Sequence, residues 1–491
     1  MMEREGSVRK IIGREREKRI LGKLLQSEGA EFLAVYGRRR IGKTFLINQF
    51  FKNLCVYFEI TGSKGASKKE QLADFHREFI ALFKPEAAYV PPKDWSEAFH
   101  LLKNEISLIG PSQKVVLFFD ELPWLASPKS GFLRALEYFW NRHASRMPNI
   151  IVVICGSAAS WMIKKVINNK GGLYGRLSAE IRLQPFSLGE VEEYFQEHRI
   201  ILTKKQIVEI FMATGGVPKY LNFVERGKSS AQNINALCFT PQSPLLKEFH
   251  KLYSSLFNEA HKHVKIVREL ANKRQGMTQT EICTALGASK SGRFGDLLEE
   301  LEESGFIIGF QSYGKQQRER KFRLIDEYSL FYLTWIDSAK QSILQGVDKD
   351  YWGKMQTSPA WHTWAGYAFE NICLKHVSKI KEGLEIAGVS TTESYWQYLP
   401  PKGRSESGAE IDLMIDRADQ CINLCEMKFY NSVYSMTKED AEDLERKKAV
   451  FRQKTQTRKA VFVTLITPYG AKENEHYLSS VDNQLTIESL F

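Results

Sequence analysis

Short apolar runs alternate with amphipathic stretches over residues 1–187. The runs are FLAVYG at 32–37, CVYFEI at 55–60, VVLFFD at 115–120 and IIVVICGS at 150–157. This alternation is typical of a parallel sheet whose two faces are both covered by helices. The pattern therefore predicts an α/β core in this part of the chain.

The pattern becomes helical from residue 188 to residue 240, where the chain carries TGGVP at 214–218. We expect a small helical lid attached to the sheet. PQSP at 241–244 predicts a linker, because prolines interrupt helices and strands.

Three helical stretches and an alternating stretch follow within residues 245–335. The helical ones are HVKIVRELAN at 263–272, MTQTEICTALG at 277–287 and SGRFGDLLEELEESGFI at 291–307. FIIGF and YGKQQRERKFRL then alternate like a β-hairpin with a basic tip. Helices followed by a hairpin predict a winged helix-turn-helix.

The last part, residues 360–491, predicts a small α/β domain. It begins with a helical stretch, WAGYAFENICLKHV, and has strand patterns near 394–398, 410–416, 421–429 and 460–466. A helix is expected around 438–453. Several domains are in keeping with a chain of 491 residues, since one domain takes about 150.

Composition indicates which kind of partner the protein binds and in which cell compartment it lies. Lysine and arginine number 69 against 58 acids, a net charge of +11, which favours nucleic acid as a partner. The apolar runs are shorter than the ~18–20 residues of a membrane helix, and the first residues lack the apolar core of a signal peptide. Seven scattered cysteines without a CxxC pair indicate reduced thiols. We therefore expect a cytoplasmic protein without a membrane partner.

GRRRIGKT at 37–44 fits the phosphate-binding pattern G-x-x-x-x-G-K-[ST] and lies between a strand and a helix, as that pattern requires. The glycines let backbone N–H groups wrap the β-phosphate of a nucleotide. Lys43 is expected to reach the β and γ oxygens, and Thr44 to hold Mg²⁺. The predicted nucleotide-binding residues of this loop are Gly37, Arg38, Arg39, Arg40, Ile41, Gly42, Lys43 and Thr44.

Two adjacent acids, Asp120 and Glu121, follow the apolar run VVLFF. Because such acids are costly to bury without a cation, we expect Asp120 to help hold Mg²⁺ and Glu121 to orient the attacking water. Glu121 thus predicts hydrolysis as well as binding. Ser157 is a candidate sensor of the γ-phosphate and otherwise a turn serine. Arg176 is a candidate arginine finger and otherwise a solvated surface arginine.

Six segments together resemble the archaeal-type P-loop ATPases, which belong to the AAA-like STAND group of signalling ATPases. They are GREREKRI, GRRRIGKT, FFDELPWL, CGSAASWM, GGLYGRLSAEIRL and TGGVPKYL. The resemblance implies an AAA-like core with a helical lid, hydrolysis of ATP with Mg²⁺, and assembly into a homo-oligomer when ATP binds.

The C-terminal segment brings acids and a lysine onto neighbouring predicted strands. AEIDLMID at 409–416 carries Asp412, and INLCEMKFY at 422–430 carries Glu426 and Lys428. Glu426 and Lys428 are two residues apart and so share a strand face. If the strands pair, two carboxylates and an ammonium gather, a set able to hold Mg²⁺ and activate water. Asp412 and Glu426 are the predicted metal ligands, and Glu370 could complete the site.

This pattern resembles the PD-(D/E)XK nucleases over residues 360–491, with Ile411 where that family has proline. The resemblance implies a restriction-endonuclease-like α/β fold and Mg²⁺-dependent phosphodiester cleavage by Glu370, Asp412, Glu426 and Lys428. Surface acids near a lysine would give the same short pattern by chance, and members of this family can lose activity.

Two basic segments are candidates for contacts with DNA phosphates. The predicted hairpin carries Lys315, Arg318, Arg320, Lys321 and Arg323, and residues 446–459 hold seven basic side chains and no acid. The second segment could guide DNA toward Asp412. Both could instead be solvated surface, and winged helices also bind proteins.

The sequence thus predicts an ATP-binding and ATP-hydrolysing DNA-binding protein with a Mg²⁺-dependent nuclease domain, suited to defence or to mobile elements. The alternative is a non-cutting STAND-type regulatory switch whose C-terminal domain only binds nucleic acid or protein. A third, weaker hypothesis is remodelling of a protein partner.

Overall fold

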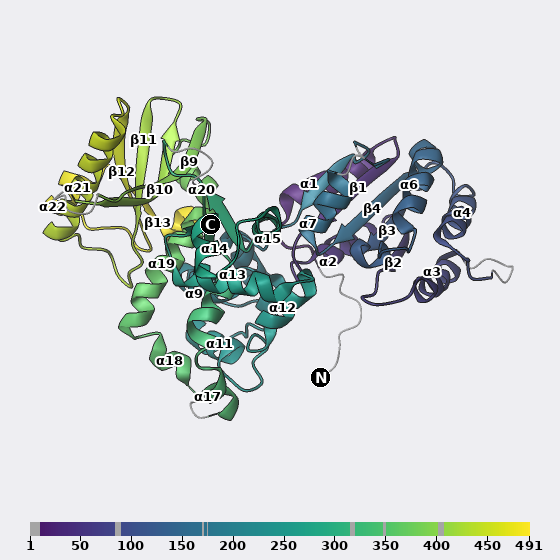
Figure 1. Cartoon of the computed structure of the whole chain (residues 1–491), viewed down its shortest axis with the longest axis horizontal. Helices are drawn as coiled ribbons and strands as arrows, with labels where there is room; N and C mark the ends of the chain where they lie inside the picture. Colours follow the sequence, from purple (N-terminus) through teal and green to yellow (C-terminus); the bar gives the residue numbers. More distant parts are fainter. Residues whose placement is uncertain are drawn as a thin grey trace. The chain divides into compact units, whose positions relative to one another are not determined.

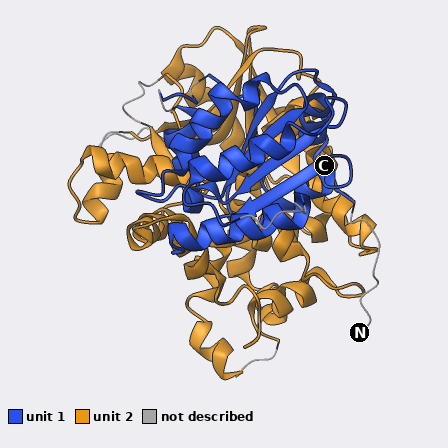
Figure 2. Cartoon of the chain, turned by 90° about the vertical axis from the view of Figure 1, so that its right-hand side faces the viewer, with its two compact units in different colours: residues 1–185 blue, residues 186–491 orange. Residues whose placement is uncertain are grey.

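The computed structural model describes residues 10–83, 90–168, 171–173, 175–314, 320–346, 350–400 and 407–491. The chain forms two compact units, residues 1–185 and 186–491 (Figure 2). Among the described residues, no helix has the length and apolar character needed to cross a membrane.

Unit 1 is built on a parallel sheet in the order β2-β3-β4-β1-β5, and Figure 1 labels β1 to β4 of this sheet. Its strands are β1 (Glu31–Tyr36), β2 (Val56–Thr61), β3 (Val115–Asp120), β4 (Ile150–Gly156) and β5 (Ala179–Arg182). The first four strands coincide with the predicted apolar runs, so the α/β prediction is confirmed. β5 lies outside those runs, because only Ile181 of its four residues is buried.

Helices cover both faces of this sheet. Along β1, Phe32 and Ala34 pack into one apolar core, and Leu33 and Val35 pack into another. The first core is shared with α3, α4 and α6 and the second with α1 and α2. The helical segments of unit 1 are α1 (Glu15–Gln26), α2 (Lys43–Phe51), α3 (Lys68–Phe83), α4 (Trp95–Ile106), α5 (Leu122–Leu125), α6 (Phe132–Arg142), η1 (Ala144–Arg146), α7 (Ala159–Met162) and η2 (Ile163–Ile167).

Unit 2 begins with the segment predicted as a lid. Its helices are α8 (Leu188–Glu197), α9 (Lys204–Thr214), α10 (Pro218–Leu221) and α11 (Ser230–Cys238). Large aromatic residues join them to later parts of unit 2: the Phe239 ring stacks on Trp352 at 5.1 Å, and Tyr220 contacts Tyr328 at 5.3 Å. These helices are therefore integral to unit 2, and the notion of a lid attached to the sheet stays a prediction.

The middle of unit 2 contains helices and a small antiparallel sheet in the order β6-β8-β7. The elements, in chain order, are α12 (Glu248–Leu256), α13 (Ala260–Asn272), β6 (Met277–Thr278), α14 (Gln279–Ala285), α15 (Gly292–Glu303), β7 (Ile307–Phe310) and β8 (Lys321–Leu324). Thr278 is the N-cap residue of α14, and its side chain forms a capping box with Glu281. The identification of residues 245–335 as a winged helix stays a prediction. Two of the basic residues of the predicted hairpin, Lys315 and Arg318, lie outside the described residues.

A mixed sheet in the order β13-β12-β11-β10-β9 ends unit 2. Its strands are β9 (Thr391–Tyr398), β10 (Ala409–Arg417), β11 (Cys421–Met427), β12 (Ala460–Thr467) and β13 (Asn483–Thr486). The accompanying helices are α16 (Glu327–Phe331), η4 (Tyr332–Ile336), α17 (Lys340–Gln345), α18 (Tyr351–Met355), α19 (Pro359–Lys375), α20 (Val377–Gly383), α21 (Lys438–Thr455), α22 (Glu475–Ser480) and η5 (Ile487–Leu490).

The pairing of β10 positions Asp412. β10 runs antiparallel to β11 with Leu413 opposite Cys425, so the next step of the same register brings Asp412 beside Glu426. On the other side, the register with β9 shifts between Ile411 and Met414. Such an irregularity re-aims the side chains within it. Asp412 therefore lies at a break in the pairing pattern.

Candidate functional sites

The phosphate-binding loop has the backbone that its glycines permit. Gly37 has φ +144°, and a Cβ at that residue would lie 2.3 Å from the Leu183 carbonyl oxygen. Gly42 has φ +91°, in the region that favours glycine. The Lys43 ammonium donates to the carbonyl oxygens of Gly37 at 2.8 Å and Arg38 at 2.9 Å. The lysine is thus held inside its own loop, where phosphate oxygens would be its other acceptors.

Side chains at the carboxyl ends of β3 and β4 form a network with this lysine. Lys43 Nζ also donates to Ser157 Oγ at 3.0 Å, and Ser157 donates to Glu121 Oε1 at 2.7 Å. Thr44 donates to Asp120 Oδ2 at 2.5 Å, and the Glu121 amide donates to Asp120 Oδ1 at 2.8 Å. The carboxyl ends of neighbouring parallel strands thus place all five residues in one connected network.

The remaining predicted nucleotide-binding residues divide by exposure. Arg38 and Ile41 are buried, whereas Arg39 and Arg40 are exposed. Arg176 is also exposed, and no hydrogen bond or ion pair joins its side chain to the network within the described part of the chain. The structure therefore gathers Ser157 with the loop and leaves Arg176 apart from it.

Residues 11–224 match a family described as an ATPase domain predominantly from Archaea. This part of the chain is an archaeal-type P-loop ATPase domain. The match includes the loop, Asp120, Glu121 and Ser157, so the ATPase domain covers the whole network.

Known proteins resemble longer parts of the chain. An uncharacterized protein of Methanocaldococcus jannaschii is 24% identical over 376 residues, which are 76% of this chain and 78% of that protein. The Walker-type ATPase of Pyrococcus abyssi is 18% identical, with a TM-score of 0.49 over 67% of this chain and 99% of its own. A STAND protein of Pyrococcus horikoshii with a tetratricopeptide repeat sensor is 14% identical, with a TM-score of 0.28 over 77% of this chain and 52% of its own.

Magnesium is implied by the ATPase domain, and the residues present fit it. Mg²⁺ is usually held by one or two carboxylates together with substrate phosphates and waters. The Thr44 hydroxyl and the Asp120 carboxylate, already hydrogen-bonded to each other beside Lys43, are oxygen donors of that kind.

A second cluster lies in the C-terminal part of unit 2, where Arg323 of β8 contacts two of the predicted catalytic acids. Arg323 Nη2 donates to Glu370 Oε2 at 3.0 Å, and its Nη1 lies 3.6 Å from Asp412 Oδ1. The guanidinium also lies over the Tyr367 ring, 4.6 Å from its centroid. Arg323 is only 3% exposed, so this charge has been withdrawn from solvent.

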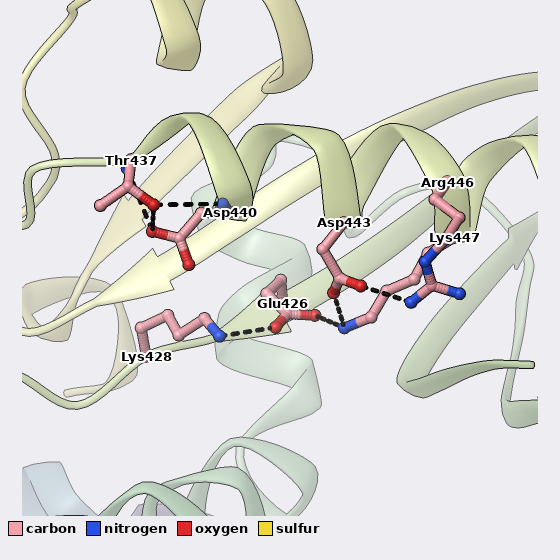
Figure 3. Close-up of polar contacts among 7 residues, drawn as sticks. All are labelled: Glu426, Lys428, Thr437, Asp440, Asp443, Arg446 and Lys447. Carbon is pink, nitrogen blue, oxygen red and sulfur yellow. Dashed lines mark hydrogen bonds and ion pairs between the residues drawn. The ribbon is translucent and has the colours of Figure 1, made fainter. Parts of the chain in front are cut away.

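Glu426 is paired with two lysines (Figure 3). Lys428 Nζ lies 3.0 Å from Glu426 Oε1, and Lys447 Nζ of α21 donates to Glu426 Oε2 at 2.9 Å. Lys447 also contacts Asp443, one helical turn before it, at 3.3 Å. β11 ends at Met427, so Lys428 lies just beyond the strand, yet it still meets Glu426 as the sequence predicts.

Burial and neighbouring charges shift the titration of the cluster. Desolvation raises the pKa of Glu370, and the nearby Asp412 raises it further, while Arg323 opposes the shift. The pKa of Asp412 is also raised, first by burial, with Arg323 lowering it and Glu426 raising it. Burial alone would lower the pKa of Lys428, but Glu426 gives a net rise. The acids thus interact with one another through space.

A cavity of about 760 Å³ opens onto these residues. Glu370, Asp412 and Lys428 line it, together with Tyr367 of α19 and the Arg274–Gln275 turn that precedes β6. Gln275 donates to Glu410, which also lines the cavity, at 2.6 Å. Residues from the middle and the C-terminal parts of unit 2 therefore form one cavity.

The predicted metal ligands of this cluster do not fit a bound metal in the arrangement seen. Asp412 and Glu370 are paired with Arg323, and Glu426 is paired with Lys428 and Lys447. Among the described residues, no group of three or more histidines, cysteines and acids is close enough to hold a metal ion. The four predicted catalytic residues come together, but the chain's own cations neutralise the acids.

Several basic residues predicted to contact DNA point to protein groups instead. In the hairpin, Arg320 pairs with Glu302, and Lys321 donates to Gln397 at 3.1 Å. In the segment 446–459, Lys447 pairs with Glu426 and Lys459 donates to Asp416 at 2.6 Å. The sequence predicts either contacts with DNA phosphates or solvated surface for Arg323 and Lys447, and it does not predict their ion pairs with the acids. The signal for Arg323 was its position between Phe322 and Leu324, because a charge inside an apolar strand needs a buried acid.

Proposed function

We propose that the network around Lys43 hydrolyses ATP and that the nucleotide state controls the C-terminal half of the chain. The supporting observation is the unbroken set of hydrogen bonds from Thr44 through Asp120, Glu121 and Ser157 to Lys43. P-loop ATPases need a cation at the phosphates, a hold on Mg²⁺ and an acid beside the attacking water. All three groups are present here within one network.

Each residue then has a distinct task. Lys43 turns from the loop carbonyls to the β and γ oxygens of ATP. Thr44 and Asp120 would hold Mg²⁺, and the bound ion would neutralise charge that develops on the phosphates. Glu121 accepts a hydrogen bond from the attacking water, and Ser157, which contacts both Lys43 and Glu121, links the γ-phosphate to that acid.

Replacement of the linking serine tests this division of tasks. Ser157→Ala is expected to keep ATP affinity within about threefold and to lower turnover at least about tenfold, because one positioning hydrogen bond is lost. Ser160→Ala, a change of the same kind in α7, is the matched control and should leave both unchanged. Unaltered turnover in Ser157→Ala would remove Ser157 from the site.

We further propose that the cavity of unit 2 binds nucleic acid, DNA in the first place, and that it is a site of phosphodiester hydrolysis. The supporting observation is that Glu370, Asp412, Glu426 and Lys428 form one cluster, three of them lining the cavity. The net charge of +11 favours a polyanionic partner. Lys428 is then the group that contacts a phosphate oxygen. The alternative is a regulatory switch in which the same cavity binds without cutting.

A substrate panel separates cleavage from binding. Plasmid, linear duplex, single-stranded DNA and RNA are incubated with the full chain, with and without ATP, in Mg²⁺ or Mn²⁺. Cleavage that Asp412→Asn abolishes, with ATP turnover unchanged, would support the nuclease. Binding without cleavage under every condition would favour the switch. Sedimentation with and without ATP tests the proposed assembly into a homo-oligomer.

A further inference from the structure

Arg323 is an unexpected component of the nuclease-like cluster. It belongs to β8, in the middle part of unit 2, while the acids that it contacts belong to α19 and β10. Phe322 and Leu324 on either side of it are buried. The guanidinium can therefore leave the acids only if its side chain rotates or β8 shifts.

We propose that Arg323 takes the place of the site's metal ion. The packing of β7 and β8 against the C-terminal sheet, called their seating below, and the binding of a metal ion by Glu370 and Asp412 then exclude one another. This inference rests on the proposed nuclease-like function. A guanidinium between Glu370 and Asp412 uses the carboxylate oxygens that a divalent cation would need. It also repels any second cation brought within a few ångströms.

The seating of β7 and β8 is held by contacts outside the acid cluster. The Tyr313 amide donates to the Tyr395 carbonyl oxygen of β9 at 2.9 Å, and Phe310 packs edge-on against the Tyr395 ring at 4.6 Å. From the other side, Asn371 of α19 donates to the Leu324 carbonyl oxygen at 3.2 Å. These contacts fix β8 relative to α19 and β9, and so they fix Arg323 relative to the acids.

Arg323 is nevertheless incompletely satisfied in this position. Its Nε and the hydroxyl of Tyr367, over whose ring it lies, are both buried without a hydrogen-bond partner within the described residues. Buried polar groups are normally paired. The arrangement is thus held by the two acids and by the seated strands, and a competing cation or a moving strand can displace it.

Calorimetric titration of Mn²⁺ into the full chain without nucleotide tests the exclusion directly. The signal that counts is the part that Asp412→Asn removes. Arg323→Gln is expected to raise the affinity of that Asp412-dependent site at least about tenfold. Arg320→Gln makes the same change of charge at the residue that pairs with Glu302, and it should leave the titration as in the wild type.

Two further measurements guard against a folding defect. Arg323→Lys keeps the positive charge and should bind Mn²⁺ no more than about threefold tighter than the wild type. In the wild type, saturating Mn²⁺ should speed hydrogen exchange at the Tyr313 amide, and Asp412→Asn should prevent this.

The outcomes separate this inference from the proposed function. Equal Asp412-dependent Mn²⁺ binding in the wild type and Arg323→Gln, with unchanged exchange at Tyr313, would overturn the exclusion and leave the nuclease proposal standing. No Asp412-dependent binding in any variant would overturn both.

Discussion

Removal of the charge from Glu121 should separate ATP binding from ATP hydrolysis. Glu121→Gln keeps the side-chain oxygen that accepts from Ser157 at 2.7 Å, so the network and the fold should persist. What is lost is the negative charge that, in the proposed role of Glu121, orients and polarises the attacking water. General-base and water-positioning groups contribute about 10²- to 10⁴-fold in rate. We expect turnover to fall by at least about 10²-fold, with ATP affinity within about threefold of the wild type.

Lys43→Ala, in contrast, should weaken the binding of ATP itself. Lys43 is 6% exposed, and its ammonium already donates to three acceptors. The ammonium is therefore held in the loop, where it can donate to phosphate oxygens. Hydrogen bonds to charged groups contribute about 1.5–3 kcal/mol, which corresponds to a loss of affinity of about 10- to 150-fold. Truncation removes this contact in the ground state, and turnover falls with binding.

Two assays decide between these expectations. A fluorescent ATP analogue titrated with Mg²⁺ reports affinity, and phosphate release at saturating ATP reports turnover. Thermal unfolding of both variants serves as the control for folding. Equal loss of nucleotide affinity in Glu121→Gln and Lys43→Ala would refute the assignment of Glu121 to the water and of Lys43 to the phosphates.

Other changes test the rest of the molecule. Gly37→Ala should abolish ATP binding and destabilise unit 1 by about 1–3 kcal/mol, because its Cβ would lie 2.3 Å from the Leu183 oxygen; melting with and without ATP measures both effects. Lys428→Ala leaves Glu426 paired with Lys447, so the unfolding free energy should change by at most about 1 kcal/mol while cleavage of DNA falls; a large loss of stability would give Lys428 a structural role instead. Arg452 and Arg458 are exposed in the basic segment, and their joint change to Glu should reduce the slope of log affinity for DNA against log salt by about 2; an unchanged slope would exclude contact with phosphates. Burial lowers the pKa of His376 to about 4, so burial of the neutral imidazole costs nothing above about pH 6.5. As the pH falls from there toward 4, the unfolded chain gains a proton that the folded chain does not, and the fold loses about 3 kcal/mol of stability at most. His376→Gln should flatten that part of a pH–stability curve.

The parallel sheet could be predicted because its strands are buried on both faces and therefore appear as continuous apolar runs. β5 could not, because Glu180 and Arg182 are exposed on an edge strand and only Ile181 carries an apolar signal. The same reason applies to β13 of the mixed sheet, which the hydrophobic pattern does not predict because Leu485 is its one buried residue. Short strands at the edge of a sheet bury too few side chains to leave a period in the sequence.

The candidate acids could be predicted from spacing, but their counter-ions could not. Asp412 and Glu426 follow from two neighbouring strands, whereas Arg323 comes from a strand about ninety positions earlier in the chain and Lys447 from a helix beyond the sheet. The ordinary hydrophobic pattern fixes which residues share a strand face. It does not fix which distant element packs on that face, since that depends on tertiary contacts such as the one between Tyr313 and Tyr395.

The placement of these cations changes what the positive net charge means. A basic side chain attracts a polyanion only while its charge faces solvent. Once it forms a desolvated ion pair, the acid cancels most of the electric field that a ligand would feel. Arg323 is paired with Glu370 and Lys447 with Glu426, so these cations cannot contact DNA and the acids at once. Any change that draws Arg323 away from Glu370 and Asp412 exposes two carboxylates to a metal ion and returns one positive charge to the surface beside them. Metal binding and attraction of a phosphate backbone would then rise together, and the packing of β7 and β8 would control both requirements of the proposed phosphodiester hydrolysis.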